Sequence, residues 1–174
     1  MRLTIGQMLS AAVERFANKA AVVAPDRTLT FDQLDRLSTQ FALHLRALGI
    51  DSGDRVTIWM ENGWRWMVAY YAVLKLGAVV NPCNILLTAE EVGFIIQDCG
   101  AKAVVVAPQK AAELRGRISA LLITDRGEAR TDLDFEVLHV LADSGDDAGA
   151  LHSEVTADER FFQVRGRQDR KSVV

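Results

Sequence analysis

The sequence has few cysteines and no long apolar run. Its 174 residues include two cysteines, Cys83 and Cys99, which lack CxxC spacing. This pattern predicts neither a disulfide framework nor a zinc site, and a reducing cytoplasm is the expected location. The longest uncharged run, residues 76–89, is shorter than the roughly 20 apolar residues that span a bilayer. The apolar stretch 8–13 is too short for a signal peptide, so we expect a cytoplasmic protein without an integral membrane segment.

A strong charge of one sign is also missing. Twenty Lys and Arg residues oppose 23 Asp and Glu residues, which leaves a formal net charge of −3. Such a chain has no general electrostatic attraction to nucleic acid or to an anionic membrane. The hydrophobic content of 49% is typical of a globular protein with a core, and the length suits one domain and a tail.

Glycine-rich phosphate-binding loops are absent from the sequence. No two of the 12 glycines are two or five positions apart, so neither GxGxxG nor GxxxxGK can occur. Phosphate oxygens need close approach of backbone N–H groups, which glycine permits. The sequence therefore contains no recognisable phosphate cradle.

Three capping boxes and one regular apolar stripe are the clearest features that the sequence does contain. The boxes predict helices that begin after Thr4, Thr30 and Thr88. The apolar stripe predicts a helix over 31–48 that ends at Gly49. Between the first two helices, residues 20–24 and 28–30 predict a hairpin. The stripe consists of Phe31, Leu34, Leu37, Phe41, Leu45 and Leu48.

Strand and helix patterns alternate from residue 55 to residue 124. Asn62 is expected to cap the first helix of this region, and Asn81-Pro82 to end the second strand. The alternation predicts an α/β fold: an open, twisted, mainly parallel sheet with helices on both faces. The predicted strands are 55–60, 78–80, 101–107 and 120–124, and the predicted helices are 64–76, 88–100 and 109–117.

The composition changes after residue 127. Residues 128–159 carry ten acidic residues and one basic residue, and only 135–141 is apolar enough for a strand or helix. Residues 160–174 are basic and lack helical or strand periodicity. We therefore expect an α/β subdomain over 1–127, a less regular acidic continuation over 128–159 and a disordered basic tail over 160–174.

Residues with reactive side chains are better explained as structural. His44, His139 and His152 have no Cys, Asp or His nearby at ligand or triad spacing. Cys83 lies in a bend without an evident cation to lower its pKa, which favours an inert thiol, and Cys99 is expected in the core.

Two further groups of residues are candidates for a site. Glu61 and Asn62 follow a strand at the edge where α/β sheets place ligands. Four aromatic residues at helical spacing favour a core or interface over a cofactor pocket. We assign no catalytic, cofactor-binding or metal-binding residue from the sequence. The aromatic residues are Trp64, Trp66, Tyr70 and Tyr71.

Six short motifs follow one another in a fixed order along the chain. They are 29–34 (LTFDQL), 48–50 (LGI), 53–56 (GDRV), 61–62 (EN), 74–84 (LKLGAVVNPCN) and 87–91 (LTAEE). In this order and spacing they resemble the N-terminal part of the adenylate-forming (AMP-binding, ANL) superfamily, which includes acyl-CoA and aryl-CoA synthetases, luciferases and peptide-synthetase adenylation domains. The resemblance covers about residues 4–125, and the motifs at 29–34 and 74–84 resemble the family's first two core motifs.

The resemblance implies activation of a carboxylic acid with ATP and Mg²⁺, and transfer of the acyl group to CoA or a carrier protein. The family's Ser/Thr/Gly-rich loop, later acidic motif and C-terminal lysine have no counterparts here. Residues 156–162 resemble the approach to that loop, and the likeness stops after them. We therefore expect the N-terminal subdomain of a fatty-acid or aryl-acid CoA synthetase, inactive by itself and prone to self-association through uncovered apolar surface.

Two alternatives belong to other classes of protein. One is a noncatalytic module that binds a nucleotide or CoA, against which the missing phosphate loop argues. The other is an interaction domain of the flavodoxin or receiver type. A receiver needs several carboxylates at neighbouring strand ends to hold Mg²⁺, and the predicted strand ends supply only Glu61.

Overall fold

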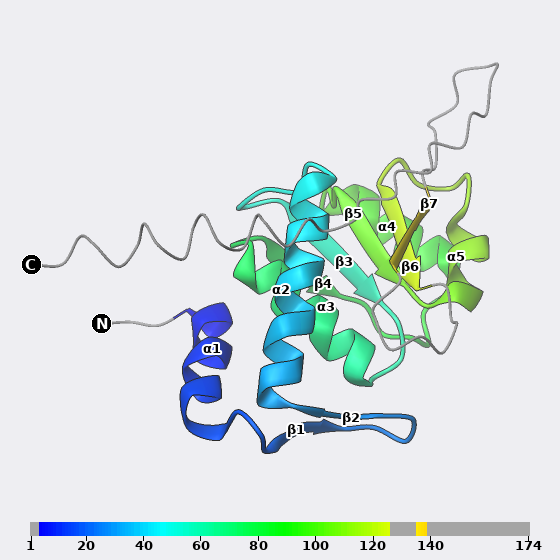
Figure 1. The fold of residues 1–174 in the computed structure, drawn as a ribbon. Helices are drawn as coiled ribbons and strands as arrows, with labels where there is room; N and C mark the ends of the chain where they lie inside the picture. Colours follow the sequence, from blue (N-terminus) through cyan, green and yellow to red (C-terminus); the bar gives the residue numbers. More distant parts are fainter. Residues whose placement is uncertain (1–3, 126–134, 139–174) are drawn as a thin grey trace, which may run out of the picture.

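A five-stranded sheet is the centre of the fold (Figure 1). The computed structural model describes residues 4–125 and 135–138. Within these residues the helices are α1 (Ile5–Phe16), α2 (Phe31–Ala47), α3 (Trp64–Lys75), α4 (Ala89–Asp98) and α5 (Pro108–Leu114). The strands are β1 (Ala20–Val23), β2 (Thr28–Thr30), β3 (Arg55–Trp59), β4 (Val79–Pro82), β5 (Ala103–Val106), β6 (Leu121–Asp125) and β7 (Phe135–Leu138).

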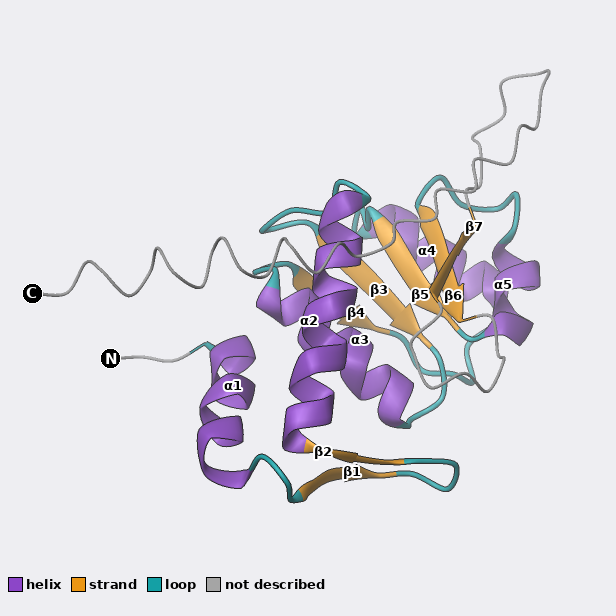
Figure 2. Cartoon of the chain, viewed as in Figure 1, coloured by secondary structure: helices purple, strands orange, loops and turns teal. Residues whose placement is uncertain are grey.

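The sheet is mainly parallel, as the alternating pattern predicts. Its strand order is β4-β3-β5-β6-β7, and every neighbouring pair is parallel except β6 and β7. Strands β1 and β2 form a separate antiparallel hairpin at the foot of α2 (Figure 2). The predicted fold class and the predicted hairpin are both confirmed.

Helices cover both faces of the sheet, because side chains alternate along each strand. Val56 and Ile58 of β3 pack into the core beneath α1, α2 and α3. Trp59 packs into a second core beneath α4 and α5. The neighbouring strand β5 divides in the same way, with Val105 in the first core and Val104 in the second. Burial on both faces explains the nearly continuous apolar composition of these strands.

Local sequence signals fix the helix starts. All three predicted capping boxes are present, and each threonine side chain accepts a hydrogen bond from the backbone N–H three residues later. Helix α5 begins with Pro108, whose missing N–H leaves no donor unpaired at this position. Helix α2 ends before Gly49, which has a φ of 83° that disfavours residues with a side chain.

A polar cluster joins the first three helices. Lys75 Nζ on α3 donates to Asp35 Oδ1 at 2.8 Å and to Thr39 Oγ1 at 2.7 Å, both on α2. Ser10 Oγ on α1 donates to the same Asp35 oxygen at 2.9 Å. Burial lowers the pKa of Lys75, and the Asp35 carboxylate opposes this shift. The cluster therefore compensates a largely buried charge with three acceptors, which include the Asp35 backbone oxygen.

Two local predictions are wrong. Asn62 does not cap α3, because Gly63 is the N-cap and no side chain bonds there. The first helical residue is the buried Trp64, whose Nε1–H donates to Asp26, so Asn62 lies one position too early.

The second error concerns the end of β4. The strand continues through Asn81 and Pro82 instead of ending before them. Pro82 is tolerated because β4 is an edge strand and has a neighbour on one side only. Asn81 is held by a bond from its Nδ2 to Thr57 Oγ1 at 3.1 Å.

Part of the predicted organisation lies outside the described residues. The segment over 135–141 is described only as β7, an antiparallel strand beside β6. Most of the acidic continuation and the whole basic tail fall outside the described residues.

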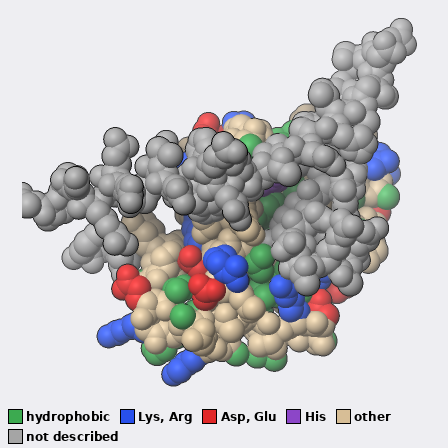
Figure 3. Space-filling model, viewed as in Figure 1, with side chains coloured by type: hydrophobic (Ala, Val, Ile, Leu, Met, Phe, Trp, Pro, Cys, Tyr) green, Lys and Arg blue, Asp and Glu red, His purple; other side chains and the backbone are tan. Residues whose placement is uncertain are grey.

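On the face that carries α1 and α2, small groups of hydrophobic side chains alternate with charged ones (Figure 3).

Leu45→Ala tests the packing of α2 on the core. Leu45 is fully buried, so its truncation should leave a cavity and lower the free energy of unfolding by about 2 to 5 kcal/mol. Arg46→Ala, an exposed change on the same helix, should alter it by less than about 0.5 kcal/mol. Thermal and urea unfolding measure both effects, and equal losses in the two variants would contradict this packing.

Candidate functional site

A cleft lies at the carboxyl ends of β3 and β4. This is the edge of an α/β sheet at which ligands usually bind. The cleft has a volume of about 310 Å³. It is lined by Met60, Asn62, Trp66, Pro82, Cys83, Asn84 and Ile85.

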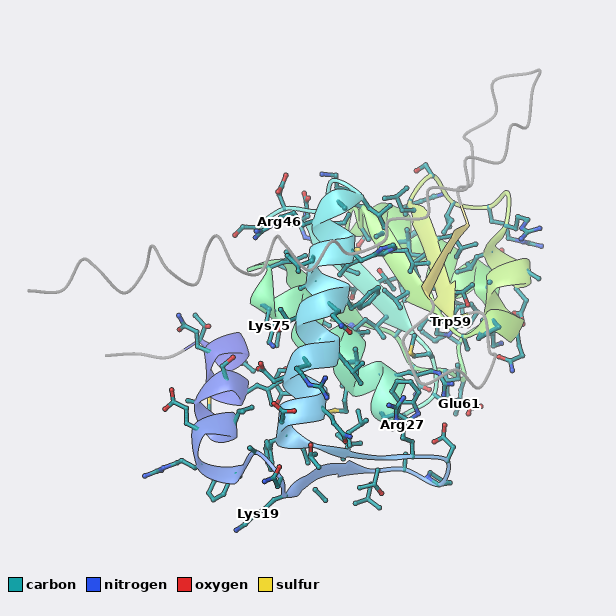
Figure 4. All side chains as sticks on the ribbon, in the orientation of Figure 1. Lys19, Arg27, Arg46, Trp59, Glu61 and Lys75 are labelled. Atoms are coloured by element: carbon teal, nitrogen blue, oxygen red, sulfur yellow. The ribbon has the colours of Figure 1, made fainter. Side chains whose placement is uncertain are left out.

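Trp59 holds the two sides of the cleft together. Its ring is fully buried, and its Nε1–H donates to the Asn84 backbone oxygen at 3.1 Å. The Cys83 N–H donates to Ile58 O at 2.9 Å, which continues the strand pairing into the bend. Lys110 Nζ lies 4.7 Å from the centroid of the Trp59 ring. Figure 4 shows Trp59 and Glu61 near the end of β3.

The bend after β4 is stabilised by its own side chains. Asn84 Oδ1 accepts a hydrogen bond from the Leu86 backbone N–H at 3.0 Å. This bond closes a short turn of the kind that asparagine favours. The turn places the backbone of Asn84 beside Trp59 and directs the chain toward α4.

Trp66 on the α3 side of the cleft belongs to an aromatic stack. The rings of Trp66 and Tyr70 are nearly parallel, with centroids 5.1 Å apart. Tyr71 meets Tyr70 edge to face at 5.5 Å, and burial raises the pKa of Tyr71. Of these three aromatic residues, only Trp66 lines the cleft.

The cleft lining contains no charged side chain. Burial raises the pKa of the Cys83 thiol, and the neighbouring Cys99 adds to this shift. The thiol is therefore a poor nucleophile at neutral pH. Glu61 follows β3 but does not line the cleft. This lining can accept an uncharged, partly apolar group, and it offers nothing to neutralise a phosphate.

The structure separates the remaining sequence candidates from the cleft. Trp64 is buried on α3 between Arg27 and Arg65, whose guanidinium carbons lie 4.8 and 4.3 Å from its ring centroid. His44 is half-buried on α2, and burial lowers its pKa. Cys99 accepts a hydrogen bond from Asn81 Nδ2 at 3.3 Å. His139 and His152 lie outside the described residues.

Sequence reasoning missed most of the lining residues. Met60, Pro82, Asn84 and Ile85 were not singled out, although all of them lie just after or at the end of a strand. The sequence feature that could have identified them is the Pro82-Cys83-Asn84 bend after β4, because β3 ends at the same edge of the sheet.

Two negative findings apply to the described residues. Residues 4–125 and 135–138 contain no cluster of three or more His, Cys, Asp or Glu side chains arranged to bind a metal ion. No helix in this part of the chain has both the length and the apolar character required to cross a membrane.

The chain belongs to the AMP-binding enzyme family, whose family model matches residues 9–161. The long-chain-fatty-acid–CoA ligase FadD13 of Mycobacterium tuberculosis is 40% identical over 103 residues. This match covers 58% of the present chain and 20% of FadD13. The chain thus spans about a fifth of the length of the curated relatives that it matches.

Solved structures show the same relationship. The inhibitor-bound N-terminal domain of FACL13 from Mycobacterium tuberculosis is 34% identical with a TM-score of 0.64, over 71% of this chain and 33% of that one. The anthranilate CoA ligase AuaEII, solved with anthranoyl-AMP, is 28% identical with a TM-score of 0.62. This match covers 64% of the present chain and 22% of AuaEII. The fold is therefore that of the N-terminal region of acyl-CoA ligases.

Alkylation of the two thiols tests the surroundings of the cleft. In a Cys99→Ser variant, Cys83 should react with iodoacetamide at pH 8 at least about tenfold more slowly in the folded chain than in urea, because burial limits access and disfavours the thiolate. The matched Cys83→Ser variant, which retains the half-buried Cys99, should show less protection. Equal rates for folded and unfolded Cys83 would contradict the described cleft.

Proposed function

We propose that this chain is the N-terminal part of an ATP-dependent acyl-CoA synthetase. That enzyme would activate a fatty or aryl carboxylic acid as an acyl-adenylate and transfer the acyl group to CoA. The family match over residues 9–161 is the observation that carries the proposal. Acyl-CoA ligases among the relatives and among the solved structures support it.

The chemistry of this reaction explains why we assign a scaffold role to the chain. A carboxylate attacks an anionic phosphate poorly, so the site must neutralise phosphate charge with a metal ion and protein cations. The described cleft carries no charged lining residue. ATP, Mg²⁺ and CoA would therefore be held mainly by parts of the enzyme outside this chain, and the chain alone would be inactive.

The proposal includes a division of the chain. We propose that residues 1–127 form the scaffold subdomain, with 128–159 as its continuation and 160–174 as a separate tail. The sheet pairing of β7 with β6 supports a continuation that returns to the subdomain. The uncharged cleft favours this scaffold role over a module that binds ATP or CoA by itself.

Pyrophosphate–ATP exchange tests the expected inactivity. With fatty and aryl acids, Mg²⁺ and ATP, the purified chain should give only background exchange, because no charged side chain lines the described cleft to stabilise the phosphate charge. FadD13 serves as the positive control. Exchange well above background that follows the pure chain would overturn the scaffold role, and calorimetry with ATP and CoA would reveal binding without catalysis.

A hybrid enzyme tests the parent activity. Residues 9–125 would replace the matching segment of FadD13, and the product would be assayed for acyl-CoA formation. We expect a folded hybrid that retains activity, because the chain shares its fold with the solved N-terminal domain of FACL13. A hybrid that carries Leu45→Ala as well should lose thermal stability, which separates a folding defect from a chemical one. A stable but inactive hybrid would contradict the proposed parent function.

A further inference from the structure

Helix α4 carries apolar side chains on both of its sides. Its inner side buries Val92 and Ile96 in the core beneath α4 and α5. On its outer side, Phe94 is 68% exposed, and Leu86 in the preceding loop is 86% exposed. A groove of about 490 Å³ lies on this outer side, and an exposed apolar patch of this kind commonly marks an interaction site. The groove is lined by Leu87, Glu90, Glu91, Phe94 and Ile95.

The α4 groove is acidic. Glu90 and Glu91 belong to its lining, and α4 contains no Lys or Arg. Glu90 makes no ion pair within the described residues. Glu91 accepts hydrogen bonds from the Thr88 backbone N–H and hydroxyl at 2.8 and 2.9 Å, which lower its pKa and keep it ionised. The groove therefore favours a partner that combines apolar side chains with positive charge.

The outer side of helix α1 carries a row of exposed apolar side chains. Ile5, Met8 and Phe16 are each at least 40% exposed. Together with the half-buried Ala12 they follow steps of three and four residues, so they lie on one side of the helix. We call these four residues the α1 row. No other part of the described chain covers it.

The charges beside the α1 row are positive. Arg15 is exposed in the last turn of α1, and Lys19 Nζ lies 4.9 Å from the centroid of the Phe16 ring. Neither cation makes an ion pair within the described residues. Glu14, the one acidic residue of α1, is two positions from Ala12 and therefore lies on another side of the helix. The α1 row thus has the apolar and basic character that the α4 groove favours.

The row and the groove of one chain cannot meet. Leu9 on the inner side of α1 packs into the core on one face of the sheet, whereas Val92 of α4 packs into the core on the other face. The sheet therefore separates the two helices, and their outer sides point away from each other. A contact between these surfaces requires two copies of the chain.

We propose that the α1 row of one copy docks in the α4 groove of a second copy. In an antiparallel arrangement, the basic end of α1 meets Glu90 and Glu91, and the row lies along Phe94. At 1.5 Å per residue the two helices are about 18 and 15 Å long, so the surfaces match in length. Pairing of two α4 grooves would instead bring like charges together. The inference goes beyond the proposed function and does not depend on it.

The contact joins two different surfaces, so it is heterologous. Each copy has one row and one groove, and the contacts therefore either close into a ring or add further copies. A contact between two short helices is small, so we expect a dissociation constant on the order of 10 to 100 µM.

Sedimentation velocity of the full chain at about 1 to 200 µM tests the association, and the average mass should rise with concentration. Met8→Glu in the row and Phe94→Ser in the groove should each weaken association by about tenfold or more. Both side chains are exposed, so thermal unfolding should show little change in stability. Val23→Ser, at a residue that is 78% exposed on the hairpin, is the matched control and should associate like the unchanged chain.

A mixture of the two variants identifies the surfaces. Each variant retains one intact surface, so an equimolar mixture of Met8→Glu and Phe94→Ser chains should form pairs but no larger species. Adding Glu90→Lys to the Met8→Glu chain should weaken this pairing by about two- to fivefold, with the larger effect at low salt.

Four outcomes would overturn the proposal. The unchanged chain could remain monomeric over the whole concentration range, or the mixture could form no pairs. Undiminished association of Phe94→Ser by itself would indicate contact between two α1 rows. Undiminished association of Met8→Glu by itself would indicate contact between two α4 grooves.

Discussion

Burial of the central strand β3 on both faces is the constraint on which the rest of this structure depends. Val56 and Ile58 face the core beneath α1, α2 and α3, and Trp59 faces the core beneath α4 and α5. Because side chains alternate strictly, a one-residue slip would exchange these faces. The pairing of β3 with β4 and β5 fixes that register. Both cores, and therefore all five helices of the described part, depend on it.

The cleft is a direct consequence of this strand. Trp59 is large enough to fill the second core and still donate a hydrogen bond to the Asn84 backbone oxygen. A smaller apolar residue would leave a cavity in this core and would leave that oxygen without its donor. The same side chain thus stabilises the sheet and holds the bend after β4, so the packing of the core positions the edge at which a ligand could bind.

Features that depend on residues close together in the sequence could be predicted from it, and features that depend on distant residues could not. Capping boxes and the Leu45 stripe depend on residues three or four positions apart, and all of them were predicted correctly. The start of α3 at Trp64 depends on Asp26, 38 residues earlier, and was misplaced. The cleft joins Met60 to Asn84 through strand pairing, so no local pattern identifies its lining. The exposure of Phe94 agrees with local spacing, because Phe94 is two positions from both Val92 and Ile96 and so lies on the other side of α4.

Two lysines of the described part are held in structural ion pairs and do not line the cleft. The largely buried lysine of the described part, Lys75, uses Asp35 and Thr39 to join α2 to α3, and it is not among the cleft residues. Lys102 is likewise held by Asp54, at 2.8 Å, and this pair lowers the pKa of Asp54. Both cations are therefore committed to structure. A reaction in which a carboxylate attacks the phosphate of ATP and displaces pyrophosphate needs cations at the site, whereas the cleft at this edge of the sheet has no charged lining residue. That contrast supports our proposal that the chain is the scaffold part of an acyl-CoA synthetase.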